Sequence, residues 1–387
     1  MVKKKFFEKV KLLFSKACYV KQNFGKGFVA QFWDLIVLSR LNPTCGIFDY
    51  YTYRVFAVER GGALYTELLG GKSNEEFNRS LNKRNAVTPA SDKLVFAVLC
   101  NAYNIRTTEI LAIYKPTGIV PEFVKTHLTD ISELKAFLKR EKMPIFVKPV
   151  KGSLGQGTFY IAGIENECEK IIDKGGKAIS FDEFIEKTIG LKVSHRYSPK
   201  AGVSLQRIVQ QHSAINEFTQ TDTPSGLRIL VLNTGSGPYI HRAVWKIVTP
   251  GNISDNFSNG AYGNMLGEID VVTGQVGGAV DRYWPDAQLL EQHPVSGRKF
   301  SEFTLPLWEK VKAEVLNASS IINDMGAMHW DVIISEEGAV FLELNDLGGT
   351  NILQVHGKGL IDSELKKSLR QMAVLQKGSV FARFING

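Results

Sequence analysis

Two short apolar stretches near the C-terminal end constrain this chain more than any other part of its sequence. Residues 328–334 (MHWDVII) and 340–345 (VFLELN) flank the polar turn SEEG, a pattern that predicts a β-hairpin. Asp331, Glu343 and Asn345 interrupt the apolar run with metal-capable oxygens. Glu343 and Asn345 point the same way because alternate side chains of a strand share a face, and the partner strand can bring Asp331 beside them. Such a set suits Mg²⁺, although two half-buried strands with ordinary polar residues fit the pattern equally well.

The length and the charge of the chain narrow its class. With 387 residues it is too long for one simple core, so we expect two or three packed subdomains. The net charge of +8 comes largely from the N-terminal segment. A basic segment suits nucleic acid, anionic lipid or a phosphate-rich ligand, and charge alone does not choose between them. We expect no nucleic-acid partner, because the chain lacks interleaved basic and aromatic residues on a recognisable binding module.

The cysteines and the apolar segments favour a cytoplasmic protein. The four cysteines are scattered singly, so neither a zinc site nor a disulfide framework is indicated. A reducing cytosol is the simplest environment for them. Charged residues interrupt the N-terminal apolar region too often for a secretory signal. No stretch approaches the roughly 20 apolar residues of a membrane-spanning helix.

Residues 1–40 alternate apolar and basic residues at roughly helical spacing. The apolar members are Phe6, Phe7, Val10, Leu13 and Phe14. A basic amphipathic helix can lie on an anionic membrane surface. It can equally pack on the main body and expose its lysines to water. We therefore expect peripheral contact with the inner membrane surface, with packing of this helix on the main body as the alternative.

A glycine-rich loop lies between two predicted strands, residues 144–149 and 158–162. Lys148 and Lys151 supply positive charge at the entrance of this loop. Its small residues are Gly152, Ser153, Gly155 and Gly157. Glycines let backbone N–H groups approach a phosphate closely. The loop is neither a Walker loop nor a Rossmann fingerprint, because both of those lead into a helix, and a glycine-rich hairpin that binds nothing is the alternative.

The remaining segments predict a mixture of helices and strands. Helices are expected from Ser91 or Asp92, at 131–142 and at 303–325, and strands at 107–114, 203–211, 227–232, 239–248 and 269–272. Residues 163–200 are expected to form irregular helices and loops. Charged residues on the largely apolar strands are expected to have partners, and these are Arg228, His241, Arg242 and Lys246.

The order of these features resembles the ATP-grasp enzymes. From Lys93 to Gly349 the chain presents a lysine, a second lysine with a glycine-rich loop, a hinge, basic residues and an Asp…Glu-x-Asn set. A narrower resemblance, to the sugar-transfer-associated ATP-grasp proteins often linked with bacterial surface-polysaccharide genes, rests on further matches. These are Asp255-Asn256, Gly260, Gly263, Ile269-Asp270, Thr273-Gly274, His293-Pro294, Gly297, Pro306-Leu307-Trp308 and Trp330-Asp331.

The resemblance implies an α+β ATP-grasp fold, in which two α+β subdomains clasp ATP, with an N-terminal helical extension. We expect a mainly helical region at 1–90. The first part of the ATP-grasp fold, with its glycine-rich lid, would occupy 91–210. The C-terminal catalytic subdomain with the metal site would occupy 211–387.

D-alanine–D-alanine ligase, another member of that superfamily, implies a role for each matching residue. The residues expected to bind ATP are Lys93, Lys148, Lys151, Gly152, Ser153, Gly155, Gly157, Gln210, Gln211 and Glu217. Among them, Gln210 would read the adenine amino group and Glu217 the ribose hydroxyls. The expected Mg²⁺ ligands are Asp331, Glu343 and Asn345, and the cations expected to act on the transferred phosphate are Arg228, Arg242 and Lys246.

Three positions depart from the family pattern or leave it open. Gln210 replaces a common acid, which changes the charge but preserves hydrogen bonding. His329 stands where the ligase has an arginine, so phosphate handling there is open. His293 is either a structural histidine or a catalytic one.

The implied activity is an ATP-dependent carboxylate–amine ligation through an acyl phosphate, in bacterial surface-polysaccharide or glycoconjugate biosynthesis. Its substrates would be small-molecule or glycan-linked carboxylates and amines. A kinase-like phosphotransferase acting on a sugar-related hydroxyl and a nucleotide-binding scaffold are the alternatives. No convincing Ser-His-Asp or Cys-His arrangement is present, and acyl-phosphate chemistry needs no side-chain nucleophile.

Overall fold

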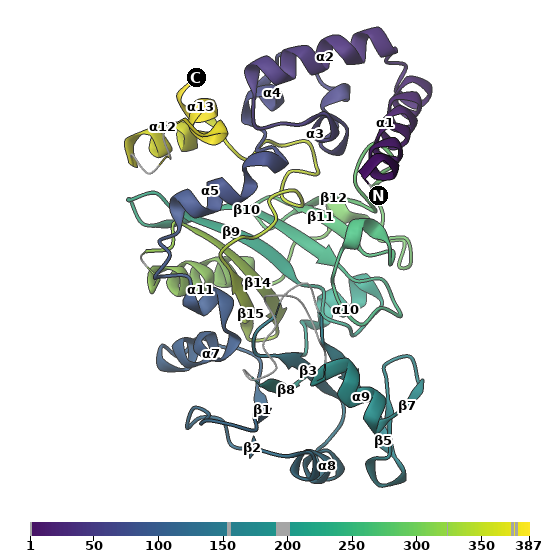
Figure 1. Ribbon diagram of the computed structural model, residues 1–387, viewed down its shortest axis with the longest axis vertical. Coiled ribbons are helices and arrows are strands. Elements are labelled where there is room, and N and C mark those ends of the chain that lie inside the picture. The colour runs from purple at the N-terminus through teal and green to yellow at the C-terminus, as the bar shows by residue number, and fades with distance from the viewer. Residues whose placement is uncertain (1, 153–155, 191–201, 323, 373–374, 376–377) are drawn as a thin grey trace.

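The computed structural model describes residues 2–152, 156–190, 202–322, 324–372, 375 and 378–387, and the side chains among these from Phe6 onward (Figure 1). Helices and three β-sheets make up an α+β fold. A seven-stranded sheet crosses the middle of the molecule, with N-terminal helices and the C-terminal helices on one side of it (Figure 1). A five-stranded sheet forms a smaller lobe at the far end.

The large sheet contains the hairpin that the sequence predicts. Its strand order is β13-β12-β11-β10-β9-β14-β15, and all its neighbouring strands are antiparallel. The strands are β9 (Leu227–Asn233), β10 (Pro238–Ile247), β11 (Met265–Ile269), β12 (Val276–Val280), β13 (Leu289–Leu290), β14 (Ala327–Ser335) and β15 (Gly338–Asn345). The hairpins predicted in this region are present, because alternating apolar residues give each strand a face to bury. The strand predicted at 269–272 is wrong: β11 ends at Ile269, and Asp270 accepts from the N–H groups of Val272 and Thr273 to form the turn before β12.

The small lobe is built on a mixed sheet of order β2-β1-β8-β3-β4. Its strands are β1 (Ile110–Tyr114), β2 (His127–Leu128), β3 (Ile145–Pro149), β4 (Phe159–Ile161) and β8 (Val203–Arg207). Helix α8 (Ile131–Arg140) begins at Asp130, whose carboxylate accepts from the N–H of Glu133, and it buries Leu134, Phe137 and Leu138. This periodicity fits the helix predicted at 131–142.

Residues 163–200 were expected to be irregular, and within the described part of that range this is wrong. The antiparallel strands β5 (Gly163–Glu165), β6 (Lys170–Ile172) and β7 (Ala178–Ser180) form a third sheet, followed by α9 (Phe181–Thr188). These strands are short and lie between charged and polar residues, which conceal the pattern in the sequence. Burial of Ile171, Ile179 and Phe184 against the small-lobe core stabilises this unit instead.

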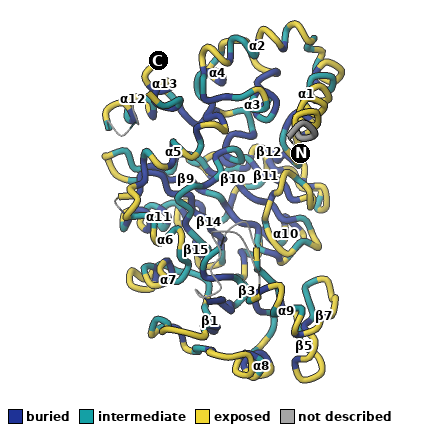
Figure 2. Tube along the Cα trace, in the orientation of Figure 1, coloured by how far each residue is buried: buried dark blue, intermediate teal, exposed yellow. Residues whose placement is uncertain are grey.

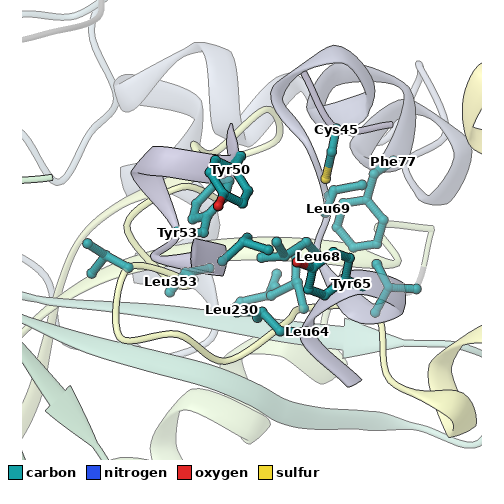
Figure 3. Packing of buried hydrophobic residues seen from close by; sticks show 14 of the residues in the cluster. Cys45, Tyr50, Tyr53, Leu64, Tyr65, Leu68, Leu69, Phe77, Leu230 and Leu353 are labelled. Carbon is teal, nitrogen blue, oxygen red and sulfur yellow. The ribbon is translucent and has the colours of Figure 1, made fainter. Parts of the chain in front are cut away.

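The N-terminal helices and the C-terminal segment share one core on one face of the large sheet. The helices that surround it are α1 (Val2–Phe24), α2 (Phe28–Leu41), α3 (Ile47–Thr52), α4 (Ala63–Glu67), α5 (Asn74–Leu81), α12 (Ser363–Met372) and α13 (Val380–Asn386). Helix α6 (Thr88–Ser91) instead packs through Ala90 on the core of the opposite face. Figure 3 shows Tyr65 and Leu68 packed with Leu230 of β9 and Leu353. The two ends of the chain therefore stabilise the same sheet face.

The opposite face of the large sheet packs on α11 (Trp308–Ser320) and α7 (Lys93–Ala102). Figure 2 shows the sheet strands as largely buried. Phe96 and Cys100 of α7 join Trp245 and Trp330 in this second core. Helix α7 therefore packs with the large sheet. The helix predicted at 303–325 is shorter at both ends and runs from Trp308 to Ser320. At its start, Leu307 has a left-handed φ of 53° and is not part of the helix.

The chain between β8 and α10 (Ser213–Thr219) ties the small lobe to the turn of the β14–β15 hairpin. The N–H of His212 donates to the carbonyl of Ile334 at 2.7 Å. The N–H of Ser213 donates to Oε1 of Glu336, also at 2.7 Å. The crossing between the lobes is therefore anchored on the strands that hold the candidate metal ligands.

Candidate functional site

The register of the β14–β15 hairpin gathers the three predicted metal ligands on one face. Asp331 lies opposite Glu343, and His329 lies opposite Asn345. Nδ2 of Asn345 is 3.4 Å from Oδ2 of Asp331 and 3.3 Å from Oε1 of Glu343. The register shifts just beyond Asp331, which leaves Leu342 as the extra residue of a β-bulge. Directly opposed residues share a face, so the carboxylates face each other across one pair of strands.

Two buried cations from the neighbouring strands hold Asp331. Nε and one terminal nitrogen of Arg228 donate to its two oxygens at 2.8 and 2.9 Å. Nζ of Lys246 lies 3.2 Å from Oδ1 of Asp331 and 2.8 Å from Oδ2 of Asp255. Burial would raise the pKa of Asp331, but Arg228 and Lys246 outweigh it and hold that pKa well below its usual range. Asp331 is therefore ionised at neutral pH.

Lysines from the small lobe and from α7 face the other carboxylate. Nζ of Lys93 lies 3.6 Å from Oε2 of Glu343 and donates to the carbonyl of Gly152 at 3.1 Å. Burial, together with repulsion from Lys93, lowers the pKa of Lys148 to about 8 despite attraction from Glu343 and Asp331. A lysine held at this pKa lacks a sufficient anionic partner.

The charges in this cluster do not balance. Arg228, Lys246, Lys93 and Lys148 provide four cations, while Asp331, Glu343 and Asp255 provide three carboxylates. A divalent cation on the carboxylates would increase the positive excess further. A polyphosphate carries the negative charge that such a cluster lacks, so the donor set suits a metal–polyphosphate pair.

The protein supplies only part of a metal shell. Nowhere in the described part of the chain do three His, Cys, Asp or Glu side chains come together as a metal site. Asp331 and Glu343 provide two carboxylates and Asn345 an amide group that can present its oxygen when turned over. Mg²⁺ usually takes one or two carboxylates and completes its octahedron with water and substrate phosphates. The incomplete set is therefore suited to Mg²⁺ arriving with a phosphate ligand.

A small cavity of about 10 Å³ lies between the lobes beside this cluster. Its lining residues are Lys93, Phe96, Ala97, Thr107, Thr108, Ile110, Lys148, Gln206 and Leu342. Gln206 is 4 % exposed, and its Oε1 has no hydrogen-bond partner. Ser204 lies two residues earlier on the same strand face, and its buried Oγ is also unpartnered. Unpaired buried polar atoms are uncommon, so these two suit a ligand that enters when the lobes move apart.

The comparison with protein families decides what kind of cleft this is. A family model described as "Sugar-transfer associated ATP-grasp" matches residues 72–368. This chain belongs to the sugar-transfer-associated ATP-grasp family. Its fold is accordingly the ATP-grasp fold, and the family resemblance seen in the sequence is confirmed.

Solved structures and curated proteins add the following comparisons. The biotin carboxylase domain of 2-oxoglutarate carboxylase from Hydrogenobacter thermophilus, crystallised with MgADP, ADP and bicarbonate, is 13 % identical, with 78 % of this chain and 52 % of that chain covered and a TM-score of 0.41. The VanG D-Ala:D-Ser ligase from Enterococcus faecalis is 11 % identical, with 75 % and 64 % covered and a TM-score of 0.41. This chain spans about half to two thirds of their length. No curated protein matches.

Within this ATP-grasp fold, the two glutamines predicted to bind ATP, Gln210 and Gln211, do not line the interlobe cavity. Gln210 is exposed. Gln211 is 4 % exposed, its Oε1 accepts from the N–H of Ser225 at 2.8 Å, and its Nε2 donates to Asn216, Thr221 and Thr223. Its amide is therefore occupied in holding its own loop. Gln206, which lines the cavity, was not among the predicted site residues; the strand was predicted to reach residue 211, whereas β8 ends at Arg207. The alternation of Ser204 and Gln206 with buried Val203 and Leu205 was the signal that pointed to it.

Two further predicted residues lie outside the cation–carboxylate cluster. Glu217 on α10 forms an ion pair with Arg298, and its side chain is 63 % exposed. Arg242 donates to the carbonyls of His241 and Gly359 at 3.0 and 2.9 Å. It lies on the same sheet face as Arg228, because Arg242 pairs with Leu230, which is two residues along the strand from Arg228. Arg242 thus holds the C-terminal segment against the sheet in this conformation.

The glycine-rich loop is described only at its ends. Ser153 and Gly155 lie outside the described residues. Gly152 accepts the hydrogen bond of Lys93, and Gly157 has a φ of +74°, a conformation that favours glycine. Lys151 forms an ion pair of 3.1 Å with Asp92. The sequence did not single out Asp92 and Asp255 as site residues, yet each holds one of the predicted lysines.

The two histidines left open by the sequence are both buried. Nε2 of His329 is 2.7 Å from Oδ1 of Asn78, and burial with the nearby charge of Arg228 lowers the pKa of His329 to about 3. Its ring is therefore neutral and packs against Gly348, where a Cβ would meet it at 2.2 Å. His293 lies against the rings of Phe218 and Phe300, and burial lowers its pKa to about 4. Both act as structural residues in this conformation.

A larger groove of about 610 Å³ lies just beyond the C-terminal end of β15. It is lined in part by Arg79, Lys83, Arg84, Asp324 and Asp346. Arg79 pairs with Glu75 and Lys83 with Asp324, so much of its charge is already neutralised. It holds none of the predicted site residues. We therefore place the functional site at the interlobe cluster despite the greater size of this groove.

Proposed function

We propose that this protein is an ATP-dependent carboxylate–amine ligase, which forms an amide in the biosynthesis of a bacterial surface polysaccharide or another glycoconjugate. The observation that carries the proposal is the unbalanced cluster of Arg228, Lys246, Lys93 and Lys148 around two facing carboxylates. Membership of the sugar-transfer-associated ATP-grasp family supports the nucleotide and the biological setting.

The described residues divide the binding of MgATP between the lobes. Asp331, Glu343 and Asn345 would hold Mg²⁺, which offsets charge on the phosphates. Gln206 and Ser204 would accept from the adenine amino group and nearby donors, in place of the exposed Gln210. Leu342 lies opposite them as an apolar wall of the cavity. The bulge that frees Leu342 from strand pairing thus gives the hairpin a role in both nucleotide and metal binding.

The cations position the phosphate and stabilise its charge during transfer. Lys93 faces the cluster from α7, and Lys148 faces it from β3, where it would contact the adenine side and the α-phosphate. Arg228 and Lys246 are fixed by Asp331 and Asp255, so little reorganisation is needed when charge develops. Arg242 would contribute only after the segment near Gly359 moves, because its donors are occupied.

The reaction needs two displacements. A carboxylate oxygen of the acid attacks the γ-phosphorus, and the bond from that phosphorus to the β–γ bridging oxygen breaks to leave ADP and an acyl phosphate. The amine nitrogen then attacks the acyl carbon, phosphate leaves, and the nitrogen loses one proton. Closure of the lobes would exclude water and protect the acyl phosphate from hydrolysis.

Trapping of the acyl phosphate tests the proposal. Enzyme, MgATP, hydroxylamine and a panel of uronic acids, other sugar acids and amino acids should give ADP and an equal amount of hydroxamate with at least one acid. A phosphorylated sugar or a stable phosphohistidine would support a phosphotransferase instead. ADP formation without hydroxamate for every acid would count against ligation.

Matched variants of the same hairpin test the site. Glu343→Ala should lower turnover at least about 100-fold, since metal ligands contribute several kcal/mol to the transition state. Glu337→Ala changes a carboxylate that is 78 % exposed in the hairpin turn, and it should leave turnover within about twofold. Equal turnover in the two variants would contradict the assignment of the metal platform.

The acid and the amine are small or glycan-linked molecules in this proposal. We place the reaction in the cytoplasm, where MgATP is available and the four cysteines, free in the structure, stay reduced. In the described part of the chain, no helix combines the length and apolarity that crossing a bilayer requires. A lipid-linked glycan acceptor would have to be reached from the membrane surface.

A further inference from the structure

The outer surface of α1 and α2 carries large apolar side chains that the fold leaves uncovered. We call Phe6, Phe7, Val10, Phe14, Phe28, Val29, Phe32 and Trp33 the aromatic surface. The exposed fractions of Phe7, Val29 and Phe32 are 70, 72 and 61 %. Figure 2 shows the exposed course of α1 at the edge of the molecule. A contiguous exposed apolar patch marks an interaction site more often than chance does.

Helix α2 is firmly attached by its other face, so its exposed residues do not reflect poor packing. Phe28, Val29, Phe32 and Trp33 follow the i, i+1, i+4, i+5 spacing of one helix face. On the inward face, Nε2 of Gln31 donates to the carbonyl of Ala17 at 3.1 Å. Arg60 donates to Asp34 at 2.6 Å, and Tyr50 donates to the same carboxylate at 2.8 Å. A rigid helix therefore presents the aromatic face outward.

Helix α1 extends the same surface beyond the body of the protein. Its C-terminal half packs on the shared core through Leu13, Ala17, Val20 and Phe24, and Lys16 donates to the carbonyl of Trp284 at 3.4 Å. From Phe6 to Leu12 every residue is exposed. The rings of Phe14 and Phe28 stack with their centroids 6.1 Å apart, which joins the two helices into one surface.

The charge around the aromatic surface is strongly positive. The first 41 residues contain eight lysines and one arginine against two acidic residues, so nearly all of the net charge of +8 lies here. Lys9 and Lys11 are exposed and form no ion pair with any described residue. Nζ of Lys21 lies 5.0 Å from the ring centre of Phe28. Asp34, one of the two acids, is buried and faces Lys26 and Arg60 instead.

We propose that the aromatic surface docks on an anionic lipid bilayer, with its aromatic side chains at the headgroup level and its lysines against anionic headgroups. Aromatic rings with flanking lysines are the composition of interfacial helices. An anionic leaflet attracts basic residues that lie within about one Debye length of its surface. A second copy of this chain is a poorer occupant, because two such surfaces would repel each other.

Docking in this way leaves the interlobe cleft accessible. In Figure 1 α1 and α2 lie at one end of the molecule, and the small lobe lies at the other end, beyond the large sheet. The opening and closing of the lobes would not be blocked by the bilayer. The proposal stands on the surface alone and does not depend on the identity of the reaction.

A vesicle experiment with the full chain tests the proposal. We expect the protein to float with vesicles of phosphatidylcholine and phosphatidylglycerol, to stay unbound with phosphatidylcholine alone, and to dissociate at high salt. The double variant Phe32→Ser/Trp33→Ser should lower the bound-to-free ratio at least about tenfold. Tyr262→Ser changes a side chain that is 65 % exposed outside the surface, and its binding should match the wild type. Absence of anionic-vesicle binding, or equal binding of the double variant, would overturn the proposal.

Tryptophan quenching reports the depth of insertion. All five tryptophans are described, and Trp33 is 51 % exposed whereas Trp245, Trp284, Trp308 and Trp330 are at most 5 % exposed. Brominated lipids in anionic vesicles should therefore quench the Trp33 emission, and Trp33→Phe should remove the quenching while it keeps the binding. Unquenched Trp33 in a bound protein would show that another surface makes the contact.

Sedimentation velocity tests the competing occupant. We expect the wild type and the double variant to sediment as the same species without lipid. A dimer that the double variant abolishes would show that the aromatic surface is a protein–protein interface, and it would overturn the lipid proposal. Lys9→Glu with Lys11→Glu should weaken anionic-vesicle binding while circular dichroism and thermal unfolding stay unchanged.

Discussion

We expect the charged side chain of Lys148 to lower the free energy of unfolding of the unliganded protein and to bind phosphate when nucleotide is present. Burial and the neighbouring Lys93 lower its pKa from 10.5 to about 8. This shift means that the charged form is less favourable in the folded protein than in the unfolded chain by about 3 kcal/mol. The residue as a whole keeps partial exposure, so water screens part of this cost. Lys148→Met keeps the apolar stem and removes the charge. We expect it to raise the free energy of unfolding by about 1–2 kcal/mol at pH 7.

The pH dependence of this difference has a definite sign. Between pH 8 and 10.5 the folded protein releases the proton of Lys148 while the unfolded chain keeps it. The unfolded state then binds more protons, so the wild-type stability rises with pH relative to that of Lys148→Met. The advantage of the variant should be complete below pH 8 and should disappear towards pH 10.5.

Urea unfolding with and without MgATP measures both consequences. Without nucleotide, Lys148→Met should unfold at higher urea than the wild type, whereas Lys142→Met, at an exposed lysine of the same lobe, should not change the midpoint. Saturating MgATP should stabilise the wild type, by about 2.7 kcal/mol at 100 times Kd, and should barely affect Lys148→Met. A Lys148→Met protein less stable than the wild type at pH 7 would refute the reasoning.

Two further outcomes separate binding residues from structural ones. Gln206→Leu should weaken ATP binding in calorimetry without loss of stability, because it removes a buried oxygen that has no hydrogen-bond partner. Gln211→Leu removes hydrogen bonds of its loop, so it should lower the free energy of unfolding by about 2–4 kcal/mol and leave the Kd of the folded protein for ATP unchanged. The low pKa of Asp331, set by Arg228 and Lys246 against the effect of burial, gives stability that is present above pH 4 and is lost as the pH falls further. Urea titrations at a series of pH values should therefore show a shallower acid loss for Asp331→Asn, and an unchanged slope would contradict the depressed pKa.

Local spacing was enough to predict most of the elements that surround the site. Alternation of apolar residues and turn residues predicted the β14–β15 hairpin and the strands on both sides of the glycine-rich loop. An N-cap residue predicted the start of α7 at Asp92. Asp92 accepts from the N–H groups of Leu94 and Val95, as an N-cap should. The short strands β5, β6 and β7 were not predicted, because burial of Ile171 and Ile179 against the small-lobe core stabilises them and the local pattern does not show that burial.

Spacing alone could not decide which glutamine lines the interlobe cavity. Gln206 lies opposite Phe146 of β3, and the neighbouring pair Ser204–Lys148 places both polar residues on the face of the second lysine. Strand β8 ends four residues before the predicted end, so Gln206 lies on the strand and lines the cavity, whereas Gln210 lies beyond the strand and is exposed. This end is set by the hydrogen bonds of His212 and Ser213 to the β14–β15 hairpin, more than a hundred residues away in the chain.

The sequence by itself determined the chemistry that is available: a face with Asp331, Glu343 and Asn345, lysines beside a glycine-rich loop, and a basic N-terminal helix. Only the tertiary structure decided which cations meet which carboxylates, because Arg228 and Lys246 reach Asp331 through strand pairings between distant segments. The same holds for α1, whose apolar residues divide between a packed half and an exposed half. Alternation and capping act within a few residues, whereas register and burial depend on what the rest of the chain covers.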